Sequence, residues 1–104
     1  MNVIKLLEEW YISNCEGDWE HDWNVKIQSV DMLGWLVSIN LVDTRVDGKE
    51  FPVYKVERSV DDWVHCKVEN SIFNGSGGAG NLEEILIVFI TWLIKVDKNF
   101  KKKK

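Results

Sequence analysis

Apolar and polar residues alternate in three separate segments of this chain, and no helix-length segment lies between them. The alternation runs from Trp23 to Gln28, from Trp35 to Val42 and from Val64 to Glu69. Each period-two pattern predicts a strand with one buried face and one wetter face. Because parallel strands need a crossover of roughly a dozen residues, the short connections predict antiparallel pairing.

A further strand is expected from Phe51 to Arg58, although its alternation is less regular. Pro52 near its start indicates an edge strand or the point where the chain enters the sheet. Turn residues lie from Asp31 to Gly34 and at Asp47-Gly48, and Asp-Gly favours a tight hairpin. Ile72-Phe73 is expected to extend the sheet only briefly.

Helical periodicity appears at the two ends of the chain. Residues 3–15 place most of their apolar side chains on one side of a helical wheel, and Gly17 follows as a stop signal. A second helix is expected after Asn81. The two helices are the available cover for the apolar face of the sheet. We therefore predict one α+β domain over residues 1–100, with an antiparallel sheet of four to five strands and both helices packed on one face.

The second helix is apolar over most of its circumference, which is more than a helix packed on a sheet from one side requires. Burial within the monomer, beside the first helix, would account for this excess. Contact of Ile87, Val88 and Ile94 with another subunit is the alternative. A homodimer therefore stays open, and so does a homo-oligomerising structural module built on this helix.

The charge of the chain is unevenly distributed. The formal net charge of the 104 residues is −4, and a lysine tail at 101–104 contributes four of the 13 basic residues. The body therefore has nine basic residues against 17 acidic ones and a charge near −8. Such a body repels nucleic acid and attracts a basic partner.

The sequence favours a cytoplasmic protein without a membrane partner. Cys15 and Cys66 are too few for the disulfide framework of a small secreted domain. The N-terminus, MNVIKLLEEWY, has acidic residues where a signal peptide needs an unbroken apolar stretch. The longest apolar run, from Ile85 to Ile94, has about half of the ~20 residues that a membrane span needs.

Gly75, Gly77 and Gly80 form a G-x-G-x-x-G pattern before the second helix. A dinucleotide-binding fingerprint also needs a parallel strand after that helix, and only a few residues and the lysine tail follow. A P-loop needs Lys and then Ser or Thr after the last glycine, where Asn81-Leu82 stands instead. We expect a tight turn from the last strand into the helix, with glycine at positive φ, and no cofactor. A small nucleotide-binding protein or enzyme is the alternative.

Asn81 is the expected N-cap of the second helix, and Glu84 stands at the capping-box position three residues later. Glu83 and Glu84 place negative charge in the first turn, where it suits the helix dipole. The same two carboxylates would repel a phosphate.

Two short segments combine acidic residues with tryptophan. The first segment contains Asp18, Trp19, Glu20, His21 and Asp22, and the second contains Asp61, Asp62 and Trp63. The first segment offers an acid, a base and potential metal ligands, but no spacing there is diagnostic of catalysis or of a metal site. Tryptophan is favoured at binding hot spots, and acidic charge speeds association with a cationic partner. We predict an acidic and aromatic contact surface, with solvated loops and packed tryptophans as the alternative interpretation.

His65 and Cys66 are neighbours on one expected strand, so their side chains point to opposite faces. They are therefore poorly placed to act together as a nucleophile and its base. Cys66 shares the apolar face with Val64 and Val68, which predicts a buried thiol.

Four segments in succession form a more specific pattern than any single motif. They read LLEEWYISNCEGDWEHDW, GWLVSINL, ERSVDDWVHCKVE and FNGSGGAGNLEEIL, and a Trp-bearing helix follows. From about Leu6 to Trp92 the chain resembles the immunity protein 53 family. The most specific parts of the resemblance are residues 17–20, residues 57–59 with 61–63, and residues 77–78 with 81–84.

That family is assigned to bacterial polymorphic toxin systems. The resemblance implies a small α+β immunity protein that neutralises a cognate toxin. Our hypothesis is that it does so without catalytic activity, by occluding the toxin through stoichiometric binding. The acidic body predicts a basic toxin surface, with a nuclease active site as one candidate. The expected contact residues are Asp18, Trp19, Glu20, Asp22, Asp61, Asp62 and Trp63.

Overall fold

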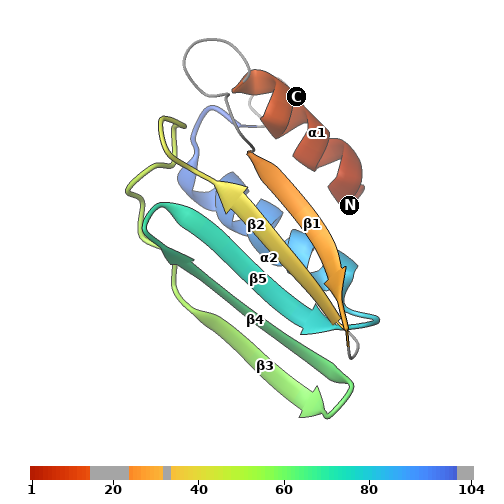
Figure 1. Ribbon diagram of the computed structural model, residues 1–104. Helices are drawn as coiled ribbons and strands as arrows, with labels where there is room; N and C mark the ends of the chain where they lie inside the picture. Colours follow the sequence, from red (N-terminus) through yellow and green to blue (C-terminus); the bar gives the residue numbers. More distant parts are fainter. Residues whose placement is uncertain (15–23, 32–33, 101–104) are drawn as a thin grey trace.

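The computed structural model describes residues 1–14, 24–31 and 34–100. These residues form a helix, five strands and a second helix. In chain order the elements are α1 (Val3–Ser13), β1 (Val25–Val30), β2 (Gly34–Asn40), β3 (Tyr54–Ser59), β4 (Asp62–Glu69), β5 (Ile72–Gly78) and α2 (Leu82–Val96). The strands form one antiparallel sheet in the order β1-β2-β5-β4-β3 (Figure 1). The predicted α+β class and antiparallel pairing are confirmed.

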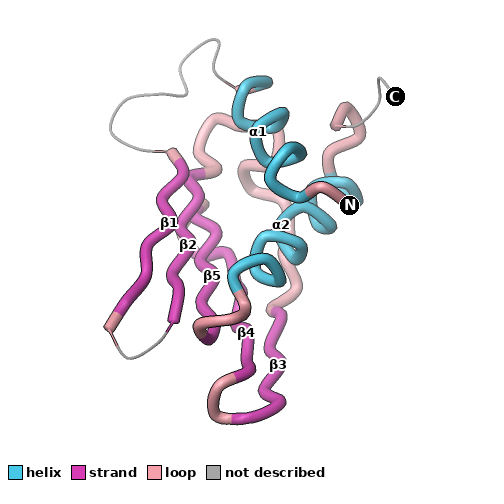
Figure 2. Tube along the Cα trace, turned by 90° about the vertical axis from the view of Figure 1, so that its right-hand side faces the viewer, coloured by secondary structure: helices cyan, strands magenta, loops and turns pink. Residues whose placement is uncertain are grey.

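Both helices lie on the same side of the sheet, as predicted (Figure 2). α2 contacts β5, β4 and α1. The centre of the core is a chain of buried rings, in which Trp10 of α1 meets Phe89 of α2 at 5.3 Å and Phe89 meets Phe73 of β5 at 4.8 Å between ring centroids. Each buried aromatic side chain contributes roughly 1.5–3 kcal/mol to the free energy of folding. The cluster therefore stabilises the contact between three elements that are distant in the sequence.

An asparagine flanks α1 at each end, Asn2 as the N-cap and Asn14 as the C-cap. The Asn2 side chain accepts a hydrogen bond from the backbone N–H of Lys5 at 3.1 Å, which caps the first turn. The helix ends at Ser13, two residues before the predicted end, where the Asn14 side chain donates to the carbonyl of Trp10 at 2.9 Å. Gly17, the predicted stop signal, lies outside the described residues.

The strand predictions hold best in the middle of the sheet. Val37 and Ile39 in β2, like Val64 and Cys66 in β4, are buried as predicted. β1 begins at Val25, and its Ile27 is exposed because β1 is an edge strand with less helix above it. Trp23, the predicted start of this strand, lies outside the described residues.

The largest difference from the sequence prediction is β5. The brief extension expected at Ile72-Phe73 continues to Gly78 and becomes the central strand, paired with β2 on one side and β4 on the other. Gly75 and Gly77 therefore lie within the sheet, and the predicted turn begins only after Gly78. The prediction of positive φ for these glycines is wrong, since Gly48 is the glycine with a left-handed φ, at 85°, in the described residues.

Close approach, not backbone conformation, explains the glycines of β5. A Cβ atom on Gly75 would lie 2.5 Å from Cγ2 of Ile85 in α2, and one on Gly78 would lie 2.5 Å from the carbonyl oxygen of Asp61. Both distances are far shorter than any ordinary van der Waals contact. Glycine in the central strand thus lets α2 approach the sheet directly.

The turn predicted at Asp47-Gly48 is present, but the predicted tight hairpin is wrong. β2 and β3 are not neighbours, since β5 and β4 lie between them. Residues 41–53 instead cross over to the opposite edge of the sheet, and Pro52 precedes the edge strand β3, as predicted. The indole N–H of Trp92 in α2 donates to the carbonyl of Glu50 at 2.9 Å, which holds this connection against the helix.

A buried ion pair joins the same connection to the end of α2. The guanidinium Nε of Arg45 lies 3.1 and 3.0 Å from the two carboxylate oxygens of Asp97, whose side chain is only 2% exposed. The backbone N–H of Asn99 also donates to Asp97, at 3.1 Å. Asp97 is therefore a buried charge that is both paired and hydrogen-bonded, as a carboxylate in that position must be.

Candidate protein-binding surface

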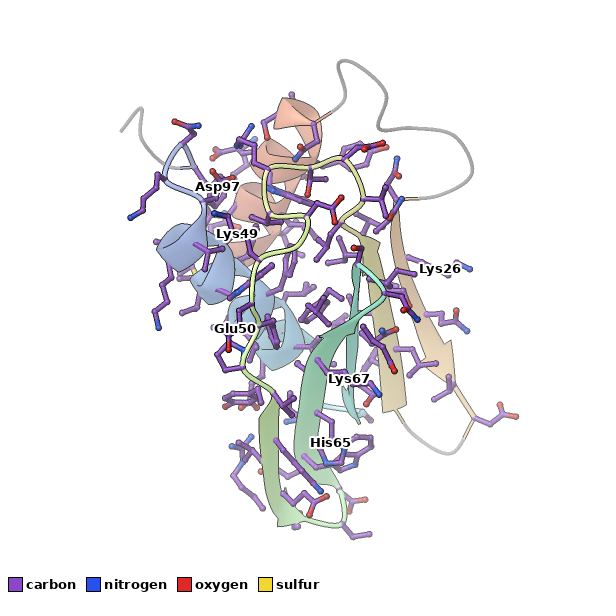
Figure 3. All side chains as sticks on the ribbon, turned by 90° about the vertical axis from the view of Figure 1, so that its left-hand side faces the viewer. Lys26, Lys49, Glu50, His65, Lys67 and Asp97 are labelled. Carbon is purple, nitrogen blue, oxygen red and sulfur yellow. The ribbon has the colours of Figure 1, made fainter. Side chains whose placement is uncertain are left out.

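The face of the sheet opposite the helices carries no helix in the described part of the chain (Figure 2). Across its middle, one row of paired residues crosses all five strands, and a second row lies beside it. The rows are Gln28, Leu36, Ser76, His65 and Lys55, then Lys26, Ser38, Asn74 and Lys67. In Figure 3, Lys26, His65 and Lys67 lie on the side of the sheet away from α2. We call this surface the open face.

The open face is hollowed at its centre. Ser76 and Asn74 of β5 are short, whereas His65 and Lys67 beside them on β4 are long. A shallow hollow of about 440 Å³ therefore lies over the central strands. Leu36 is exposed there, which leaves an apolar side chain at the middle of a polar surface.

Trp63, His65 and Glu57 form a cluster at one end of the open face. Strand alternation places Trp63 and His65 on the same side of β4, with ring centroids 5.0 Å apart. Glu57 of β3 is the register partner of Trp63, and its carboxylate lies 2.8 Å from Nε2 of His65. A second hollow, of about 550 Å³, is lined by these three side chains and by the turn that joins β3 to β4.

Cys66 lies on the other face, as predicted from its position next to His65. Its side chain is 1% exposed, and burial raises the pKa of the thiol to about 12. The thiol is therefore protonated near neutral pH, and it packs as a small apolar residue.

Asp62 belongs to a polar network at the start of α2. Arg58 forms a two-pronged ion pair with it, at 3.0 Å for both contacts, and the same guanidinium reaches Glu84 of α2 at 2.5 Å. The hydrogen bonds from Arg58, followed by the one from Asn81, lower the pKa of Asp62. The carboxylates of Asp62 and Glu84 in turn raise the pKa of Arg58. The network keeps the Asp62 carboxylate charged and joins β3, β4 and α2.

The capping box predicted for α2 is wrong in its detail. Asn81 occupies the N-cap position, but its side chain accepts no hydrogen bond from the first turn. Its amide donates instead to Asp62 at 2.9 Å and to Glu84 at 3.1 Å. Two nearby carboxylates compete for that amide, so the side chain bridges them and leaves the backbone uncapped.

The predicted contact residues Asp61, Asp62 and Trp63 share one end of the sheet, but they do not share one side of it. Asp61 is exposed in the turn between β3 and β4, and its carboxylate has no hydrogen bond or ion pair with another described residue. Asp62 points toward the start of α2, whereas Trp63 lies half-buried on the open face. Asp18, Trp19, Glu20 and Asp22 lie outside the described residues.

Sequence reasoning missed the pairing of His65 with Glu57. The signal was present in the short turn between β3 and β4, because a hairpin closed near Val60 places Glu57 opposite Trp63. Two residues further along β4, His65 then comes within reach of Glu57. Arg58 and its two carboxylate partners were also missed, since Glu84 is distant in the sequence.

No group of three His, Cys, Asp or Glu side chains in the described ranges is arranged to hold a metal ion. Neither helix in those ranges is both long and apolar enough to cross a bilayer. The glycines offered as a nucleotide loop are engaged elsewhere, since Gly75 pairs with Val37 and Cys66 in the sheet. Their backbone is therefore not arranged as a phosphate-binding turn.

The architecture defines a small α+β protein in which two helices cover one face of an antiparallel sheet, while no helix among the described residues covers the other. Residues 4–94 match the family model of immunity protein 53, which covers most of the 104-residue chain. The protein belongs to the immunity protein 53 family, as its motifs predicted. This membership supports an immunity function and implies a toxin protein as partner. No curated protein and no solved structure matches the chain.

Proposed function

We propose that this protein neutralises a cognate bacterial polymorphic toxin by forming a stoichiometric complex with it, without catalysing a reaction. Membership of the immunity protein 53 family is the observation that carries this proposal. The proposed setting is the bacterial cytoplasm, where an immunity protein meets a toxin before it can act. The acidic body favours a toxin with a basic surface, and a nuclease active site fits that description.

The proposed contact surface is the end of the sheet where β3 turns into β4. Trp63 supplies a partly exposed indole beside a hollow, as a hot-spot residue requires. Asp61 adds a carboxylate with no partner among the described residues, so it is available to a cation on the toxin. Asp62 contributes mainly by holding this end of the sheet through Arg58. Asp18, Trp19, Glu20 and Asp22 complete the proposed set.

The complex is tested by co-expressing this chain with candidate polymorphic-toxin domains, the first taken from any toxin gene found next to its own gene, followed by titration calorimetry. A one-to-one stoichiometry with loss of toxin activity is expected. Substoichiometric inactivation, with turnover of the toxin into a modified product, would contradict the proposal of simple occlusion.

The acidic surface is tested by charge reversal. Asp61→Lys is expected to slow association several-fold at low ionic strength and less at high ionic strength, because long-range steering is screened by salt. Glu9→Lys, on the exposed side of α1, is the matched control and is expected to change the rate little. Equal effects of the two reversals would rule out a specific contribution from the β3–β4 end.

A further inference from the structure

A groove of about 720 Å³ runs along one flank of α2. Its walls come from Phe51, Pro52 and Val53 in the connection that enters β3, and from Ile87, Thr91 and Lys95 of the helix. Val53 is 72% exposed and Ile87 is 36% exposed, so the groove has apolar side chains open to water. Figure 3 shows the connection, with Lys49 and Glu50 labelled, running beside α2.

The groove exists because the helix layer is one-sided. α1 packs against α2. Helical spacing places Leu86, Ile90 and Leu93 on the flank of α2 opposite the groove, and all three are buried. On the other flank, within the described residues, the neighbour is the connection at 49–53. As far as residues 1–14, 24–31 and 34–100 show, the helix layer therefore has room for one more helix next to α2, above the edge of the sheet that ends with β3.

The exposed side chains of α2 form a single stripe with opposite charges at its two ends. The stripe consists of Glu83, Ile87, Thr91, Ile94 and Lys95, which follow each other at helical spacing. The first turn is acidic and the last turn is basic. Glu83 and Lys95 form no ion pair with another described residue.

The charges of this stripe are complementary to those of a second copy that runs in the opposite direction. If two copies of α2 pack antiparallel about a twofold axis, the acidic first turn of each lies next to the basic last turn of the other. The exposed isoleucines then meet near the axis, and the same patch serves both copies, as a twofold interface requires. A parallel arrangement would instead bring like charges together at both ends.

We propose that this face of α2, with the adjoining groove, is where a second copy of this chain docks. The two α2 helices pack antiparallel, with Ile87 and Ile94 in the contact and the Glu83 end of one copy next to the Lys95 end of the other. Both open faces point outward from such a dimer, because they lie on the far side of each sheet from α2. If toxin binding at the β3–β4 end holds as proposed above, the dimer would carry two such contact surfaces, one on each copy.

The first experiment measures the mass of the full chain by sedimentation equilibrium over a range of micromolar concentrations. The wild-type chain is expected to form a dimer, and Ile87→Glu combined with Ile94→Glu is expected to give a monomer. Ile12→Glu, at a 66% exposed position on α1, is the control and should leave the dimer intact. Near-ultraviolet circular dichroism of the buried tryptophans shows whether each variant is folded.

The second experiment is a charge swap. Glu83→Lys alone and Lys95→Glu alone each place like charges together, and each is expected to raise the dimer dissociation constant by roughly five- to tenfold because a twofold axis doubles the effect. The double variant restores opposite charges, so its dissociation constant is expected to return close to that of the wild type. Recovery in the double variant is not expected from a merely structural effect on α2.

Three outcomes would overturn the dimer. The first is a wild-type chain that stays monomeric at the highest concentration. The second is a folded variant with both Ile87→Glu and Ile94→Glu that still dimerises. The third is a Glu83→Lys and Lys95→Glu double variant whose dissociation constant does not return toward that of the wild type. A monomeric wild type whose toxin affinity falls in the Ile87→Glu variant would assign the groove to the toxin instead. Since the toxin titration is a separate measurement, failure of the dimer leaves the proposed immunity function standing.

Discussion

The two faces of the sheet are built from the same strands but use their residues differently. On the covered face, β4 contributes Val64 and Cys66, and β5 contributes bare glycine backbone on which Ile85 packs. On the open face the same two strands present Trp63, His65 and Ser76. The residues of the covered face are fixed by close packing in the core, whereas those of the open face make few packing contacts. Substitutions on the first face should therefore change stability, and those on the second should change binding.

The largest effect is expected in the ring cluster of the covered face. Phe89→Ala removes the ring that contacts both Trp10 and Phe73, so it should lower the free energy of unfolding by about 3–5 kcal/mol. Leu36→Ala, on the open face, should lower it by less than about 1 kcal/mol, because its side chain is already exposed. Urea denaturation followed by tryptophan fluorescence measures both. Similar losses for the two variants would mean that the open face is covered in solution.

A smaller but sharper contrast is expected between adjacent residues of β5. Gly75→Val places a side chain against Ile85, and the overpacking should cost about 2–3 kcal/mol or prevent folding. Ser76→Val points to the open face and should be tolerated within about 0.5 kcal/mol. The same denaturation assay decides. A tolerated Gly75→Val would show that α2 does not lie close to the central strand.

The opposite pattern is expected for Trp63. Trp63→Ala should weaken toxin binding by about 2 kcal/mol, as truncation of a hot-spot tryptophan does, with a smaller loss of stability. Titration calorimetry measures the affinity and thermal unfolding measures the stability. Loss of stability without loss of affinity would show that Trp63 stabilises the fold, as the residues of the covered face do, and does not contact the toxin.

The smallest effect is expected at the boundary between the two faces, in the Arg58 network. Because the pKa of Asp62 is lowered in the folded protein, its ionised form contributes stability above the unfolded pKa, and this contribution is lost as the pH falls through the folded value. Asp62→Asn should therefore be less stable than the wild type near neutral pH, and the difference should shrink below about pH 4. Denaturation curves at several pH values measure it, with Asp61→Asn as the control. A difference that grows in acid would contradict the assignment.

Most of the secondary structure could be predicted from local patterns. Alternation identified β2 and β4, and helical spacing identified both helices, because each pattern is written in consecutive residues. β5 escaped this reasoning since its glycines have no side chains to alternate. The N-cap Asn81 and the Asp47-Gly48 turn were placed correctly. The hydrogen bond of Asn81 to Asp62 and the strands that the turn connects were not predicted, because they depend on other elements of the fold.

The candidate site was less predictable than the fold. Strand alternation separated His65 from Cys66 correctly, and it would also have separated Asp62 from Trp63. Which of these residues is free for a partner depends on Arg58, Asn81 and Glu84, which the fold brings together from three elements. Tryptophan and aspartate in one short segment therefore do not by themselves make one surface.

The sequence by itself determined the class of fold, the antiparallel pairing, the burial of Cys66 and the membership of a family, since each depends on residue order and local periodicity. Only the tertiary structure decided that β5 is central, that its glycines receive α2, and that Arg58 and Asn81 engage the Asp62 carboxylate. The physical reason is that close packing and ion pairing depend on distances between residues far apart in the chain.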